Sequence, residues 1–267
     1  MKKQKLAKVV RSYGRVIADN SRKIPGGFDV DLIHDLRVAY KKLRAFIRLM
    51  QEEERKLEMP EDIKLLYRSC GTVRDLQLVI ERLKDSRELI PHFLKGLHHE
   101  LFTAKELLVM HIEDISVRKA VKEIVEGLPV ELTGDMVRHF IQRKVATIHV
   151  LLLALEHEEE LHAIRKALKD LVYVKKILSE DLGFDYPFSE WTDDEKLEKL
   201  NTQLGDLNDQ HIALSFFDTK RIAEAPAEEQ PAIQVLQRQW ETEKNEMMLA
   251  AMQKVRGLGN FFRLQPL

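Results

Sequence analysis

A row of cations at helical spacing is the feature of this sequence best suited to chemistry. It lies in residues 34–48, HDLRVAYKKLRAFIR, and places His34, Arg37, Lys41, Arg44 and Arg48 three and four residues apart. If this segment is a helix, each residue turns by about 100°, so the five side chains share an arc of roughly 80°. Like charges at this spacing cost folding free energy, a few tenths of a kcal/mol per pair, which a bound anion would offset.

The chemistry that such a row offers is the binding of a linear polyanion. Arginine presents planar pairs of donors to phosphate oxygens, whereas lysine acts as a flexible point charge. Cations about 5–6 Å apart along a helix can neutralise successive phosphates, and counterion release adds an entropic gain. The histidine that starts the row either donates a hydrogen bond to phosphate or has a structural role, as a helix cap or as a core-edge residue bonded to a backbone group. The sequence leaves both roles open.

A weaker copy of this row recurs 128 residues later, where Val172 stands at the position of Arg44 and Asp170 at that of Lys42. Apolar residues match at the same offset. A duplicated helical unit with an approximate two-fold axis is the economical explanation. The members of the second row are His162, Arg165, Lys166, Lys169 and Lys176.

Further candidate binding residues lie outside the two rows. Asp75 and Asp209 end two similar segments, GTVRD (71–75) and GDLND (205–209). We interpret these acids as positioning groups for a neighbouring base or helix terminus, with a catalytic carboxylate as the alternative. The additional candidate cations are Arg15, Lys42, Arg74 and Arg143.

The elements that must carry these residues are helices. The 11 glycines and 8 prolines are few for 267 residues, and no convincing strand pattern is present, so we expect an all-α fold. A break at Gly127-Leu128-Pro129 predicts two domains, residues 1–128 and 129–267. Helices are predicted over residues 1–20, 30–54, 61–84, 92–112, 116–126, 134–157, 158–182, 192–220 and 231–256.

Composition restricts the classes of function. The formal net charge is −1, so anion binding must come from local patches. The single cysteine, Cys70, excludes an internal disulfide and favours a reducing compartment, so a cytoplasmic location is expected. The longest apolar run, residues 150–155, is far too short to span a membrane. Because no metal-ligand spacing and no nucleotide-binding glycine pattern is present, neither a metal nor a cofactor is expected.

Four motifs together resemble the signatures of the CHAD family, the conserved-histidine α-helical domain. They are HDLRVAYKKLRAFIR, GTVRD, LHAIRKALKDLVY (161–173) and LGDLND (204–209), and they span nearly the whole chain in the family's order. The resemblance implies two four-helix bundles about a pseudo-two-fold axis, with basic helices facing a shared cleft. It also implies binding of inorganic polyphosphate. Val172 and Asp170 depart from the family's second signature, which usually has arginine and often a base at these positions.

The prediction is therefore a non-catalytic module that binds inorganic polyphosphate through both basic rows, and three alternatives remain. Nucleic-acid binding is less favoured, because single-strand binders interleave aromatic side chains and only Tyr173 lies near the basic faces. A metal-assisted polyphosphatase would use Asp75 or Asp209. A purely structural bundle would contact an acidic partner protein, with the acidic segment 193–198 as an example.

Overall fold

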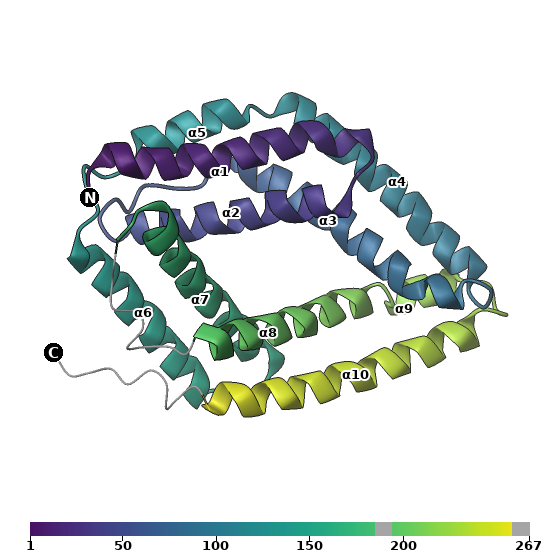
Figure 1. The fold of residues 1–267 in the computed structure, drawn as a ribbon. Coiled ribbons are helices and arrows are strands. Elements are labelled where there is room, and N and C mark those ends of the chain that lie inside the picture. Colours follow the sequence, from purple (N-terminus) through teal and green to yellow (C-terminus); the bar gives the residue numbers. More distant parts are fainter. Residues whose placement is uncertain (185–193, 258–267) are drawn as a thin grey trace.

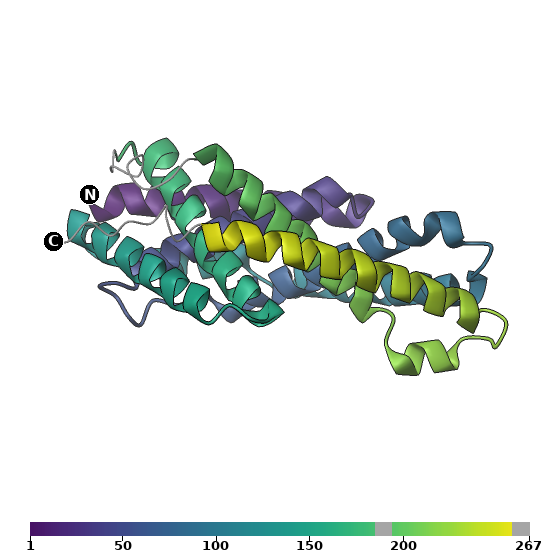
Figure 2. The same ribbon diagram turned by 90° about the horizontal axis from the view of Figure 1, so that it is seen from below.

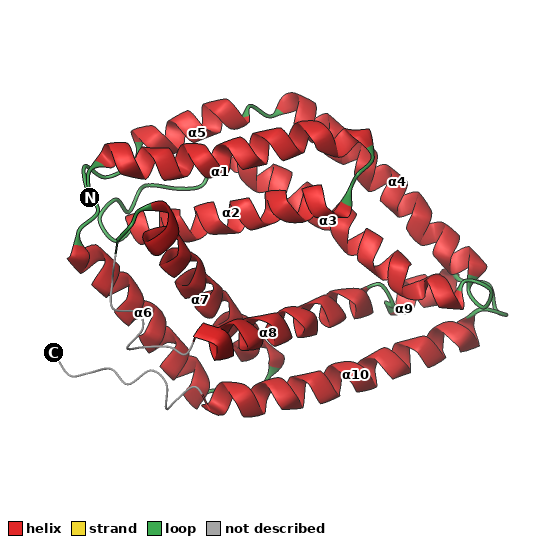
Figure 3. Ribbon diagram, in the orientation of Figure 1, coloured by secondary structure: helices red, strands yellow, loops and turns green. Residues whose placement is uncertain are grey.

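The computed structural model describes residues 1–184 and 194–257 and confirms an all-α fold (Figures 1 and 3). Within these residues the β-type pairing is limited to one isolated bridge, between Lys2 and Glu131. In the same part of the chain, none of the helices combines the length and the apolar content needed to cross a bilayer. The α-helices are α1 (Lys3–Lys23), α2 (Val30–Met50), α3 (Glu61–Leu83), α4 (Pro91–Asp114), α5 (Val117–Glu126), α6 (Gly134–Leu153), α7 (Glu158–Lys176), α8 (Asp194–Ser215), α9 (Thr219–Glu224) and α10 (Gln230–Arg256).

The long helices pack in pairs, α1 with α2, α3 with α4, α6 with α7, and α8 with α10. Figure 1 shows these pairs as the sides of an open frame, and Figure 2 shows its elongated shape from below. The second half repeats the packing of the first, since α2 contacts α3 and α7 contacts α8. The halves meet where α2 packs against α6 and α7 and where α3 packs against α8. The two-fold axis and the domain limits, 1–128 and 129–267, stay predictions.

Helix α2 shows why the basic row faces away from the core. Asp29 caps its start, because the Asp29 Oδ1 accepts hydrogen bonds from the backbone N–H groups of Asp31 and Leu32, both at 2.9 Å. The predicted apolar side of the helix is buried, and each leucine, isoleucine or methionine side chain on it contributes about 1.5–3 kcal/mol. The opposite side therefore carries the cations. The buried residues of the predicted stripe are Leu36, Ala39, Leu43, Ile47 and Met50.

Four predicted helix ends are wrong. The helix predicted over 158–182 ends as an α-helix at Lys176, and a π-helical turn covers Ile177–Asp181. Helix α2 ends at Met50 rather than at 54, because three consecutive glutamates follow (52–54) and negative charge is unfavourable at a helix C-terminus. Helix α6 ends at Leu153 rather than at 157, and the chain turns there to bury Leu155. The helix predicted over 192–220 is divided, because Asp218 caps a separate helix, α9, by accepting from Arg221 N at 3.0 Å. Its predicted start at 192 lies outside the described residues.

Candidate anion-binding cavity

A cavity of about 490 Å³ between the two halves brings the two basic rows together. Because α2 packs directly against α7, the rows form facing walls. Most of the predicted binding residues therefore share one site. The cations and histidines that line it are His34, Arg37, Lys41 and Arg44 from α2, Arg74 from α3, and His162, Arg165, Lys166 and Lys169 from α7.

The structure leaves the other five predicted binding residues outside this cavity. Three of them are paired with acids from elsewhere in the chain. Arg48 Nη1 lies 2.8 Å from Asp170 Oδ2, and Lys176 Nζ lies 2.7 Å from Glu198 Oε1. The sequence offers the acidic segment 193–198 as a contact for the basic rows of another molecule. Its Glu198 instead pairs with Lys176 of the same chain. Arg143 pairs with Glu52, Lys42 lies over the Tyr13 ring, and Arg15 is exposed. The five residues are Arg15, Lys42, Arg48, Arg143 and Lys176.

Arg37 is held by backbone and aromatic contacts rather than by an acid. Its Nη1 donates to the Tyr67 carbonyl at 3.1 Å, and its Cζ lies 4.5 Å from the centroid of the Tyr67 ring. That ring in turn stacks on Tyr40, with centroids 4.0 Å apart and planes at 16°. A β-carbon at Gly71 would overlap Arg37 Nη1. The glycine of GTVRD therefore makes room for the guanidinium.

For the polyphosphate binding expected from the sequence, the substitution Gly71→Ala should lower the affinity about tenfold without unfolding the protein. Alanine favours a helix over glycine by about 1 kcal/mol, which offsets the roughly 1 kcal/mol of the lost Arg37 hydrogen bond. The guanidinium, however, must leave its place on Tyr67. The control is Gly96→Ala on α4, where a β-carbon meets nothing within 4 Å. Titration and thermal unfolding of both variants measure the two effects, and unchanged affinity of Gly71→Ala would contradict this role of the glycine.

Burial and nearby positive charge act on two lysines that line the cavity, one from α2 and one from α7. Burial, followed by Lys169, Arg37 and Arg165, lowers the pKa of Lys41 to about 7. Burial, followed by Arg165, lowers the pKa of Lys169 to about 8. Among the described residues, neither amine makes a hydrogen bond or an ion pair. A bound anion would therefore stabilise the charged form of both lysines.

Two arginine nitrogens in the cavity are buried without an acceptor. Arg44 Nε on α2 and Arg165 Nε on α7 have no hydrogen-bond partner in the part of the chain that the structure describes. A buried donor left unsatisfied costs about 1–3 kcal/mol. Both atoms are shielded from solvent in this conformation, so a ligand oxygen between α2 and α7 would reach them only after the arginine side chains turn.

His34 and His162 line the cavity, and their helices start with other caps. Asp29 caps α2. At the start of α7, Glu160 Oε2 accepts from the backbone N–H of His157 at 2.8 Å. His34 and His162 therefore do not cap these helices, while the core-edge role stays an open alternative to ligand binding.

Both of these imidazoles have a pKa below that of a free histidine. Burial, followed by Arg74 and Lys41, lowers the pKa of His34. Burial, followed by Lys166, lowers the pKa of His162. Near neutral pH, in the protein without a bound ligand, each of these two imidazoles is therefore mostly uncharged and has one N–H to donate to a ligand oxygen.

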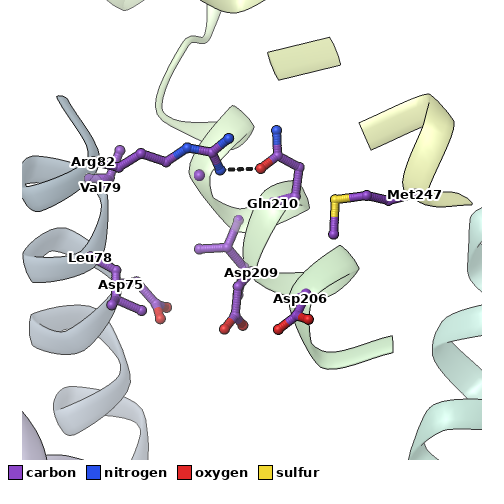
Figure 4. Close-up of a pocket in the computed structure, with 10 residues that line it drawn as sticks. Asp75, Leu78, Val79, Arg82, Asp206, Asp209, Gln210 and Met247 are labelled. Carbon is purple, nitrogen blue, oxygen red and sulfur yellow. Dashed lines mark hydrogen bonds between the residues drawn. The ribbon is translucent and has the colours of Figure 1, made fainter. Parts of the chain in front are cut away.

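Three carboxylates separate the basic cavity from a smaller pocket of about 320 Å³ between α3, α8 and α10. Figure 4 shows Asp75 on α3 and Asp206 and Asp209 on α8 with their carboxylates at the same side of this pocket. Burial raises the pKa of Asp75 and of Asp206, and the charge of Asp209 adds to both shifts. Arg37 acts on Asp75 through charge, and no hydrogen bond joins the two among the described residues. The acids mark one limit of the positive site.

The described residues contain no group of three or more histidine, cysteine, aspartate or glutamate side chains arranged to hold a metal ion.

Sequence reasoning missed one face of α8 that lines the cavity. Asn201, Gly205, Asn208 and Ile212 recur there at intervals of four, three and four. This is the helical spacing of the basic rows, and it could have identified the face. Tyr67 gave no such signal, because its place depends on the packing of α3 against α2. The cavity residues that the sequence did not single out are Tyr67, Asn201, Thr202, Asp206 and Ile212.

Comparison with known proteins finds the same family that the four sequence motifs resemble. Residues 9–217 match the sequence profile of the CHAD domain. PptA from Streptomyces chartreusis superposes with a TM-score of 0.68 at 14% identity, over 97% of this chain and 99% of that one. The crystal structure of the CHAD domain from the plant Ricinus communis superposes with a TM-score of 0.72 at 16% identity. The match covers 98% of this chain and 93% of that one. These two likenesses show a shared fold. No curated protein sequence matches the chain significantly.

Proposed function

The chain belongs to the CHAD domain family, and we propose that it binds inorganic polyphosphate, without cleaving it, in the cavity between its two halves. The observation that carries the proposal is the meeting of the α2 and α7 rows in one cavity, where Lys41 and Lys169 pair with no acid among the described residues. Buried, unsatisfied nitrogens on Arg44 and Arg165 favour a ligand rich in anionic oxygens. Every unit of a phosphate chain supplies such oxygens.

Each cation type has a distinct part in the proposed complex. The arginines offer planar donor pairs to phosphate oxygens, while Lys41 and Lys169 place point charges between them. Release of counterions from the polyanion makes the affinity depend on salt concentration. Cations outside the cavity attract the polyanion without contacting it in the cavity. Salt screening limits this attraction to a range of about 10 Å at 0.1 M salt. These outer residues are Arg15, Lys42, Arg48, Arg143 and Lys176.

The tyrosines of the cavity favour polyphosphate over single-stranded nucleic acid. Tyr67 lines the cavity, but Tyr40 stacks on its ring at 4.0 Å and the Arg37 guanidinium lies over it at 4.5 Å. A ring and a guanidinium at these distances cannot share one face, so both faces of Tyr67 are covered. Single-strand binders need free aromatic faces for base stacking. Tyr173 is the other cavity tyrosine and is half-buried.

The test is a titration with long-chain polyphosphate at two salt concentrations, beside single-stranded RNA of equal charge. We expect tight, salt-sensitive binding of polyphosphate, weak binding of RNA, and no release of phosphate with or without magnesium. Equal binding of both polymers would indicate general electrostatic attraction instead. Release of phosphate would indicate a polyphosphatase with Asp75 or Asp209 as its carboxylate. Binding of neither polymer would overturn the proposal.

Polyphosphate affinity is expected to fall as the pH rises from about 6.5 to about 9. In the free protein Lys41 and Lys169 lose their protons near pH 7 and pH 8. A bound polyanion favours the charged amines, so binding takes up protons in this range and weakens as the pH rises. By linkage, the logarithm of the affinity falls by at most about one per pH unit for each titrating lysine. Calorimetry in buffers of different ionisation enthalpy measures the proton uptake, and its absence would contradict the prediction.

A further inference from the structure

We propose that Lys41 and Lys169 are nucleophilic amines that accept an acyl group from small acyl phosphates bound in the cavity. The inference rests on the proposed anion-binding function and extends it to a covalent modification that weakens polyphosphate binding. No contact outside the cavity is required.

The surroundings of the two amines favour their neutral, nucleophilic form. Lys41 on α2 and Lys169 on α7 line the same cavity, and neither forms an ion pair among the described residues. Two other lysines near the junction of the halves are paired, Lys144 with Asp170 at 2.5 Å and Lys176 with Glu198 at 2.7 Å. An amine that is half-buried among cations loses its proton more readily than one in water, and the neutral amine is the nucleophile.

The charged groups around the amines are mostly positive. Arg37 and Arg165 act on Lys41 together with Lys169, and Asp209 is the acid that opposes them. The same Asp209 and Arg165 act on Lys169. Asp75 and Asp206 lie at the same border of the cavity as Asp209. A fourth acid, Asp170 on α7, also lines the cavity, but it is paired with Arg48 and Lys144. The α2 and α7 walls around the two amines therefore stay positive.

The arginines provide a place for the phosphate group of the donor. Arg37 precedes Lys41 by four residues, and Arg165 precedes Lys169 by four, so each pair lies about 5–6 Å apart along one helix face. The buried Arg165 Nε has no acceptor of its own among the described residues. A phosphate bound to Arg165 would hold the acyl carbonyl one helical turn away, beside the lysine amine.

The reaction is a simple acyl transfer. The neutral Nζ attacks the carbonyl carbon, a C–N bond forms, and the C–O bond to phosphate breaks. Inorganic phosphate leaves with the electron pair of that bond, and the proton of the amine passes to water or to the departing phosphate. The product is an uncharged amide, so each transfer removes one cation from the cavity.

The experiment uses the full chain and acetyl phosphate at about pH 7.5, with the acetylation rate of each lysine followed by mass spectrometry. Lys42 is the matched internal control, because it is the next residue in the chain and lies outside the cavity. Exposed Lys95 on α4 is a second control. We expect Lys41 and Lys169 to react at least about tenfold faster than both controls, and long-chain polyphosphate to suppress the difference.

Acetic anhydride, an uncharged reagent, separates amine reactivity from phosphate docking. The preference for Lys169 over Lys42 should be larger with acetyl phosphate than with the anhydride, and Arg165→Gln should remove this excess. Equal rates at all four lysines, in a preparation that still binds polyphosphate, would overturn the inference alone. Fast reaction at Lys41 and Lys169 without polyphosphate binding would instead overturn the proposed function and leave the acyl-acceptor assignment in place.

Discussion

Replacing Lys41 and Lys169 together by glutamine is expected to abolish polyphosphate binding and, at the same time, to stabilise the free protein. Each substitution would remove one charged hydrogen bond between a lysine and a phosphate oxygen, and such a bond contributes about 1.5–3 kcal/mol. Together the two losses correspond to a decrease in affinity of roughly 10²- to 10⁴-fold. Titration of the double variant with long-chain polyphosphate measures this loss.

The gain in stability has a definite sign and a definite pH range. In the folded protein the pKa values of Lys41 and Lys169 lie at about 7 and about 8, below the ordinary 10.5 that applies when the chain is unfolded. The unfolded chain therefore binds more protons between about pH 7 and pH 10.5, so stability of the wild type rises with pH across this range. The variant lacks this dependence. We expect it to be more stable than wild type at about pH 6, and the difference to disappear towards about pH 10.

The size of the gain is limited by the partial exposure of both amines. We expect about 1 kcal/mol or more, which corresponds to roughly 2–4 °C in Tm for a chain of this size. The matched control removes the same two charges from the same two helices, as Lys42→Gln and Lys176→Gln. Because these residues lie outside the cavity, we expect less than about a tenfold loss of affinity. A loss equal to that of the cavity variant would show that binding depends on total charge and not on the cavity.

Asp170→Asn is expected to destabilise the protein by about 2–4 kcal/mol. The Asp170 carboxylate accepts from Arg48 Nη1 at 2.8 and 3.0 Å and from Lys144 Nζ at 2.5 Å, and so joins α7 to α2 and α6. An amide of the same shape leaves the two cations without their counterion. Removing one partner of a buried pair costs about 3–5 kcal/mol. We expect a smaller loss, because 36% of the Arg48 side chain is exposed, against 16% for Lys144 and 4% for Asp170.

Urea unfolding with an unchanged m-value measures this destabilisation. The control is Asp135→Asn, which removes an acid from an exposed pair with Arg138 at 3.2 Å on α6. Exposed pairs contribute about 0–1 kcal/mol, so the control should remain close to wild type. A variant at position 170 as stable as the control would show that the cations of α2 and α6 do not need this carboxylate.

The sequence alone determined that the basic rows lie on helices and which face of each helix carries them, although it did not predict the division between α8 and α9. Apolar positions on α2 recur with the period of the helix itself, so the buried side of that helix, from Leu36 to Met50, followed from local spacing. The basic row on its other side followed for the same reason. The repeat at 128 residues predicted that α7 would carry a second row, and α7 does so with Arg165 and Lys169.

Only the tertiary structure decided which of these cations share a site. Periodicity defines a direction around one helix, but it carries no information on which residues of another helix lie opposite. Arg48 belongs to the α2 row, yet α7 places Asp170 against it, and Lys176 meets Glu198 of α8. In sequence, Asp170 looked like a lost base of the second row. In the fold it is the counterion that holds three helices together, because packing of α2 and α6 against α7 places two cations on one buried carboxylate.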